Sequence, residues 1–145
     1  MEAVIEFHGF KDNYNRFIIK ELAIVSKHFQ CQLIFKSPFS KHLLNSKMAR
    51  TCRWLTRHYH HIDWDEGDVP FNERLVNTLC KQFATIYTNG LEKAEFLRSF
   101  HNNVKEIHCI NVNENVDVGC LLSQHSQGKC ALRSAKHMYL TIPRV

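Results

Sequence analysis

The sequence predicts a mixed α/β domain in which three antiparallel strands are followed by strands alternating with helices. Two observations carry this prediction. The first 36 residues contain three apolar runs of strand length separated by turn residues, and from residue 40 onward apolar residues recur at helical spacing, with two short strand-like runs between them. The chain has 145 residues, which suits one domain, residues 1–145, with one core.

The strand segments of the first third are short, apolar and rich in β-branched residues. They read VIEF at 4–7, RFIIKELAIVS at 16–26 and FQCQLIFK at 29–36, and the polar segment KDNYN at 11–15 has the composition of a tight turn. Pro38 is expected to end the third strand. Consecutive strands joined by short turns predict an antiparallel meander.

Four helices are expected after residue 40. The first begins at a Ser40 cap and places Leu44, Met48, Cys52 and Leu55 on one face. The others cover residues 72–84, 90–100 and 129–140, with strands expected at TIYTN (85–89) and VKEIHCINV (104–112). This order, βββααβαβα, is the order of the ribonuclease-H-like α/β fold, with a mixed sheet.

Composition favours an intracellular protein with an anionic partner. The sequence contains no recognisable secretion signal and no run of about 20 apolar residues that could span a bilayer, so a cytoplasmic or nuclear location without membrane contact is expected. The six cysteines are therefore expected to be reduced thiols, some of them metal ligands. The formal charge of +5 is a weak indication of nucleic-acid binding.

The carboxylates of a two-metal nuclease are largely missing from the positions where this fold places them. The first strand should carry Asp-x-Glu, but here it reads Glu6-Phe7-His8, and imidazole is a poor ligand for Mg²⁺. The acid expected in the turn YTNGLEKAEFL falls on Lys93, beside Glu92, and the last helix offers Arg133 instead of an acid. We therefore expect no intact exonuclease site and assign no catalytic residue.

A cysteine and histidine cluster near the C-terminus predicts a zinc site. Cys120, His125 and Cys130 lie within eleven residues, and thiolates and imidazoles are ligands that Zn²⁺ prefers. The alternative is a pair of buried cysteines with a surface histidine. Glu21 stands inside the apolar run FIIKELAIV, where a buried carboxylate needs a partner, although an outward-facing position is equally compatible. Candidates for the fourth ligand are Glu21, Cys109, Cys31 and His61.

Two further polar regions are candidates for binding. RHYHHIDW contains His58, His60 and His61 ahead of several acids; a second metal site is conceivable, but a polar loop with inward-packed Tyr59, Ile62 and Trp64 is favoured. Lys41, Lys47, Arg50, Arg53 and Arg57 fall near one side of the expected helix and could follow a phosphate backbone. A second basic area for nucleic acid could be formed by Lys93, Arg98, Arg133 and Lys136. A solvated helix face explains these charges equally well.

The segments FIIKELAIV, IYTNGLEK and C…H…CAL together resemble the Maelstrom domain, a ribonuclease-H-like domain of the small-RNA (piRNA) silencing pathway. The resemblance spans residues 4–138 in short stretches. It implies that one structural zinc ion is bound by Glu21, Cys120, His125 and Cys130. The spacing of Cys120 and His125 departs from the usual pattern, so Cys109 is a possible substitute for Cys120. A site filled by four side chains leaves no position for water or substrate, which is typical of structural zinc.

The resemblance implies a catalytically degenerate module that binds RNA or a silencing-pathway protein and acts in piRNA or transposon silencing. One alternative is a weak, metal-independent endonuclease for single-stranded RNA, with Lys20, Lys93, Arg98 and Arg133 as the candidate residues. The other is a protein-interaction scaffold derived from a mobile element.

Overall fold

The computed structural model describes residues 1–107 and 130–142. Six strands form one mixed sheet in the order β4-β3-β2-β1-β5-β6. The strands are β1 (Glu2–Lys11), β2 (Phe17–Ser26), β3 (Gln30–Lys36), β4 (Val69–Pro70), β5 (Thr85–Asn89) and β6 (Val104–Ile107). The helices are a short 3-10 turn, η1 (Lys41–Leu43), and α1 (Ser46–His58), α2 (Glu73–Lys81), α3 (Leu91–Arg98) and α4 (Ala131–Thr141).

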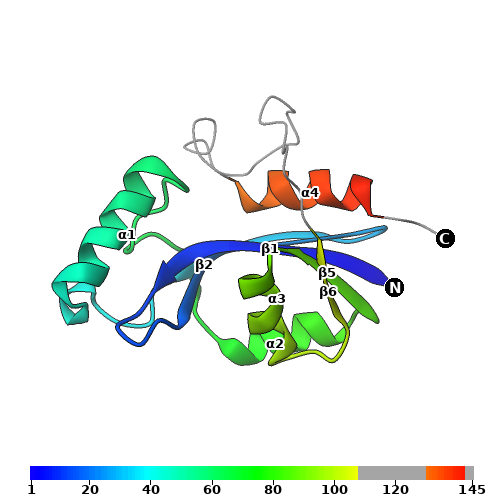
Figure 1. Cartoon of the computed structure of the whole chain (residues 1–145), viewed down its shortest axis with the longest axis horizontal. Helices are drawn as coiled ribbons and strands as arrows, with labels where there is room; N and C mark the ends of the chain where they lie inside the picture. The colour runs from blue at the N-terminus through cyan, green and yellow to red at the C-terminus, as the bar shows by residue number, and fades with distance from the viewer. Residues whose placement is uncertain (108–129, 143–145) are drawn as a thin grey trace.

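The helices cover both faces of the sheet (Figure 1). Helix α4 lies on one face, and helices α2 and α3 lie on the other. Helix α1 stands beside the C-terminal end of β1, where β2 begins. β1 pairs antiparallel with β2 and parallel with β5, and β5 pairs parallel with β6. The strands β1, β5 and β6 therefore share a direction, and their carboxyl ends meet at one edge of the sheet.

Alternating side chains of β1 explain why both faces are covered. Ala3, Ile5 and Phe7 join the core cluster that includes residues of α2 and α3, whereas Val4 joins the cluster formed with α4. Successive residues of a strand point to opposite faces, so a strand that is apolar at nearly every position needs a layer on each side. The polar residue Glu6 shares the face of Val4 and is 2% exposed.

A β-bulge separates the two halves of the β1–β2 pair. His8 pairs with Glu21, but the next residue, Gly9, pairs with Ile19, so Lys20 is the extra residue on β2. A Cβ atom on Gly9 would lie 2.0 Å from the carbonyl oxygen of Ile18, a distance that no side chain tolerates. The absence of a side chain at Gly9 therefore lets the bulge form and redirects Lys20 away from the regular ladder.

The predicted α/β class with a mixed sheet is confirmed, and the described residues show the predicted elements in the predicted order, with two local differences. Residues 108–112 of the strand predicted at 104–112 lie outside the described residues. The first helix does not start at Ser40: the Ser40 hydroxyl accepts a hydrogen bond from the His42 amide and caps η1, and α1 starts after an Asn45 cap. No strand was expected between the first two predicted helices, but Val69–Pro70 form the short strand β4, which pairs in parallel with β3. Over the described ranges, no helix has the length and apolar character needed to cross a membrane.

Candidate metal centre and basic surface

The Glu21 carboxylate and the Cys130 thiol lie together in the layer between β2 and α4. Glu21 is fully buried, and Cys130 is 2% exposed and forms the N-cap position of α4. Glu21 Oε1 accepts a hydrogen bond from the Ala131 amide at 2.9 Å, and Oε2 accepts one from Gln32 Nε2 at 2.6 Å. Burial raises the pKa of Glu21 to about 7, against the lowering effect of these hydrogen bonds.

The spacing of these two groups fits adjacent ligands of one zinc ion. Cys130 Sγ lies 3.7 Å from Glu21 Oε2. Tetrahedral Zn²⁺ with Zn–O of about 2.0–2.2 Å and Zn–S of about 2.3 Å separates neighbouring oxygen and sulfur ligands by about 3.5–3.7 Å. Zinc would supply the positive charge that a buried carboxylate and a thiolate require, and Gln32 would remain hydrogen-bonded to the carboxylate as a supporting group.

The remaining predicted ligands fall into two groups. Cys120, His125 and the substitute Cys109 lie outside the described residues. Cys31 packs with the core cluster on the α2 and α3 side of the sheet, and His61 is a loop residue with a positive φ of 56°. Across residues 1–107 and 130–142 no three His, Cys, Asp or Glu side chains gather closely enough to hold a metal. Glu21 and Cys130 are thus the two members of the predicted set that are seen together.

Lys93, which stands where the sequence analysis expected a nuclease acid, pairs with Glu6. Lys93 Nζ lies 2.5 Å from Glu6 Oε1, and the side chains are 21% and 3% exposed. Glu6 Oε1 also accepts the Phe7 amide at 3.0 Å, and the Lys93 ammonium lies 5.4 Å from the centre of the Phe7 ring. The lysine ammonium therefore neutralises this buried carboxylate within the chain.

The other residues suggested for metal-independent chemistry are engaged in the fold or lie apart from Lys93. Lys20 is fully buried, and its ammonium donates to the carbonyl oxygens of Trp64, at 2.9 Å, and Glu66. Burial lowers the pKa of Lys20 to about 8. Arg98 donates to the Val104 carbonyl at 3.1 Å. Arg133 is on α4, on the face of the sheet opposite α3 (Figure 1).

Helix α1 concentrates the positive charge of the protein. Its residues Lys47, Arg50, Arg53 and Arg57 are all exposed, and the helix contains no acidic residue. With Lys41 of η1, residues 41–58 carry a charge of +5, equal to the formal net charge of the whole chain. Among the described residues, no ion pair involves these five cations. This surface is free to attract an anionic partner.

Trp54 is exposed in the middle of this basic surface, and the sequence analysis missed it. Its side chain is 57% exposed and its ring lies 5.5 Å from that of His58, centre to centre. Arg50, Arg53, Arg57 and His58 line a shallow hollow with Trp54. The helical pattern contained the signal, because Trp54 lies off the apolar stripe formed by Met48, Cys52 and Leu55. An aromatic ring surrounded by cations is typical of surfaces on which single-stranded bases stack.

A second hollow, of about 420 Å³, separates α1 from β1 and reaches Lys93. It is lined by Lys11, Lys47, Thr51, Tyr59 and Lys93 above a floor of phenylalanine rings. Two of its three lysines are neutralised, because Lys11 pairs with Glu92 and Lys93 pairs with Glu6. This hollow is therefore a weaker anion site than the outer side of α1.

His60 has a structural role. It is fully buried, its Nε2 lies 3.2 Å from the Gly9 carbonyl, and its Nδ1 accepts the Ile62 amide at 3.1 Å. Ile62 and Trp64 are also buried, so the polar-loop interpretation of residues 58–68 is supported for these two inward positions. Tyr59 is only half-buried and packs edge-on against the His8 ring at 5.3 Å.

No protein-family profile, curated protein or solved structure matches the chain significantly.

Proposed function

We propose that this chain is a ribonuclease-H-like domain of the Maelstrom type that binds single-stranded RNA and does not cleave it with two metal ions. The strand order supports the fold, because a central strand flanked by an antiparallel meander and by parallel strands is the arrangement expected for that class. We place the domain in small-RNA or transposon silencing, as the sequence resemblance implies.

The observation that carries the RNA-binding proposal is the outer surface of α1. Lys47, Arg50, Arg53 and Arg57 surround the exposed ring of Trp54 without an acid in the helix. Cations neutralise phosphates regardless of sequence, and an exposed indole offers a stacking platform to any base. The combination fits single-stranded RNA, whose bases are accessible, better than a duplex, whose bases are stacked inside.

The pairing of Glu6 with Lys93 supports binding without two-metal cleavage. A carboxylate that is 3% exposed and already bound to an ammonium is a poor site for Mg²⁺, which prefers several oxygen ligands. On this proposal, the surface captures RNA and leaves the strand intact.

Zinc has a structural part in this proposal. Glu21 and Cys130, with Cys120 and His125, would hold one Zn²⁺ that fastens β2 to the start of α4. The charge of the ion would stabilise the buried carboxylate and thiolate, and metal binding would contribute directly to folding. Elemental analysis is expected to find one zinc per chain in the wild type and none in Glu21→Ala or Cys130→Ser.

The RNA-binding experiment measures the affinity of fluorescent oligouridine for the wild type, Trp54→Ala and Trp54→Phe. Loss of a stacking ring costs about 1–3 kcal/mol per base, so Trp54→Ala should weaken binding about tenfold or more. Trp54→Phe, which keeps a ring, should retain most of the affinity. The probe should remain uncut with and without Mg²⁺. Equal affinity in all three proteins would remove Trp54 from the interface.

A further inference from the structure

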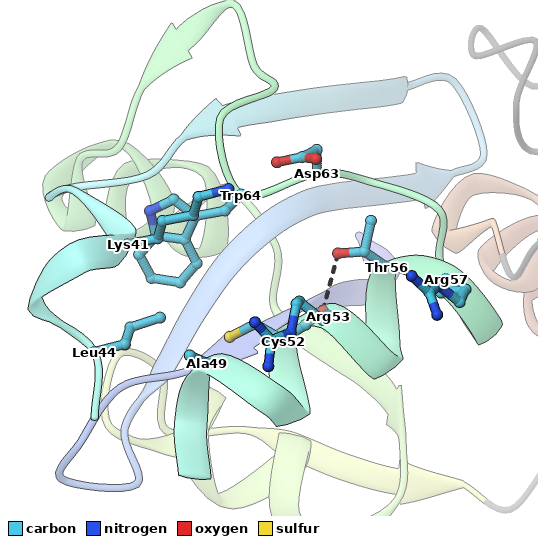
Figure 2. Close-up of a pocket in the computed structure, with 9 residues that line it drawn as sticks. All are labelled: Lys41, Leu44, Ala49, Cys52, Arg53, Thr56, Arg57, Asp63 and Trp64. Atoms are coloured by element: carbon cyan, nitrogen blue, oxygen red, sulfur yellow. Dashed lines mark hydrogen bonds between the residues drawn. The ribbon is translucent and has the colours of Figure 1, made fainter. Parts of the chain in front are cut away.

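A cavity of about 390 Å³ lies between α1 and the loop that follows it, on the side of α1 that faces Trp64 (Figure 2). It is built from three segments: η1 and the residues after it, helix α1, and residues 63–64. Its volume is within the usual range of small-molecule sites. Its lining combines an apolar floor with charges at the rim, and nothing described so far uses it.

The walls of the cavity are held in place by buried and part-buried hydrogen bonds. Trp64 is 3% exposed, and its Nε1 donates to the Phe39 carbonyl at 2.9 Å. The Trp64 carbonyl accepts hydrogen bonds from Lys20 Nζ at 2.9 Å and from the Ser37 hydroxyl at 2.6 Å. The Thr56 hydroxyl lies 2.9 Å from the Cys52 carbonyl and 3.1 Å from the Ile62 carbonyl, which ties α1 to the loop. A site held in this way is formed before a ligand arrives.

The floor and the rim match the parts of a nucleotide. Leu44, Ala49, Cys52 and Trp64 provide the apolar part of the lining, against which a flat ring can pack. Arg53 and Arg57 are exposed at the rim on the α1 side, where their guanidinium groups can bind a phosphate. The same two arginines belong to the basic surface around Trp54, so a strand bound there has a base within reach of the cavity.

The acidic residue of the cavity lining is Asp63, whose Oδ1 also accepts a hydrogen bond from the Asp65 amide at 3.2 Å. Its exposed carboxylate stands at the rim across from α1, as Figure 2 shows. An ionised carboxylate only accepts hydrogen bonds. Guanine offers two adjacent N–H donors on its Watson–Crick edge, at N1 and N2, whereas adenine, cytosine and uracil each place an acceptor beside their single donor group. A base that turns a hydrogen-bond acceptor toward Asp63 would bring its lone pair against the negative carboxylate, which would then lack a donor.

We propose that this cavity binds one unstacked guanine base of single-stranded RNA, with Asp63 reading the base and Arg53 and Arg57 holding its phosphate. This inference deepens the RNA-binding function proposed above and rests on it. Lys41, also on the rim, adds positive charge for the phosphate.

The test uses the full chain and compares oligouridine with the same strand carrying one central guanosine, adenosine or cytidine. The guanosine strand should bind the wild type about tenfold or more tightly than the others, the effect of hydrogen bonds to a charged group. Asp63→Asn should remove the guanine preference and leave oligouridine binding unchanged. Asp65→Asn, which removes a neighbouring exposed acid that does not line the cavity, is the matched control and should keep the preference.

A second variant fills the cavity without changing charge. Ala49→Leu should reduce guanosine-strand binding to the oligouridine level while oligouridine itself binds as before. If all four strands bind the wild type equally, the guanine site is wrong and the Trp54 surface still stands. If Ala49→Leu and Asp63→Asn keep the preference, the base lies elsewhere and the cavity assignment is overturned. If no strand binds, both this inference and the proposed function fail.

Discussion

The pair formed by Glu6 and Lys93 allows a stability test of how strongly the lysine ammonium stabilises the buried carboxylate. At 2.5 Å and an effective dielectric constant of about 20, the Coulomb attraction is on the order of 6–7 kcal/mol before desolvation is subtracted. Removing one member of a fully buried pair costs about 3–5 kcal/mol, because the other charge is left without a partner.

The two members of the pair should respond unequally to mutation. Lys93→Met leaves the Glu6 carboxylate, which is 3% exposed, with the Phe7 amide as its one partner among the described residues. We therefore expect a loss of about 2–3 kcal/mol, discounted for the 21% exposure of Lys93. Glu6→Gln leaves an ammonium that can turn toward water, so it should cost about 1 kcal/mol. The double variant should lose less than the two single variants added together.

Urea unfolding at pH 7, followed by circular dichroism, measures these differences. Lys11→Met is the matched control, because Lys11 pairs with Glu92, whose side chain is 64% exposed, and such surface pairs contribute about 0–1 kcal/mol. The reasoning is refuted if Lys93→Met costs no more than the control, or no more than Glu6→Gln.

Two further predictions concern Glu21 and Gly9. The pKa of Glu21 is raised to about 7 from an ordinary 4.5, so in zinc-free protein its contribution to stability is present below pH 4.5 and lost as pH rises through 7. The change in unfolding free energy across this pH range is about 3 kcal/mol. It is measured in the presence of a chelator, as the difference in unfolding free energy between the wild type and Glu21→Gln at each pH. A difference that does not change with pH would contradict the prediction. Gly9→Ala should cost about 2 kcal/mol or more, because its methyl group meets the Ile18 carbonyl; an unfolding free energy equal to wild type would show that the bulge tolerates a side chain.

The order of elements could be predicted from sequence because each has a clear period and clear ends. The run FIIKELAIV is apolar on both faces, which predicts a central strand, and β2 is central. The start of α1 could not be predicted as well, because Ser40 and Asn45 are both good caps and only tertiary contacts decide between them. Asn13, which lies in a distant turn, favours the start at Asn45. Its side chain accepts a hydrogen bond from the Asn45 amide at 2.9 Å and donates one to the Leu43 carbonyl at 3.1 Å.

The candidate sites likewise combine features that the sequence predicts with features that only tertiary contacts determine. The residues alone left Glu21 as one of four candidates for the fourth ligand, and only the resemblance put it in one set with Cys130, which it contacts in the structure. The Glu6–Lys93 pair was predicted only in part. The sequence showed Lys93 at a position where an acid was expected, but it did not show that the Lys93 ammonium binds the Glu6 carboxylate. The cavity beside Trp64 depends on a loop held by the buried Lys20, and long-range hydrogen bonds of this kind leave no periodic signal.

The most direct test of RNA binding by α1 is the salt dependence of oligouridine affinity. For single strands, the slope of log K against log salt is about −0.7 per neutralised phosphate. Arg50→Gln with Arg57→Gln should make the slope shallower by about 1.4, because two phosphate contacts are lost. The control pair, Arg74→Gln with Lys81→Gln, makes the same charge change on α2, which packs on the sheet away from α1. An unchanged slope in the α1 variant, or an equal change in both, would contradict an RNA interface on α1.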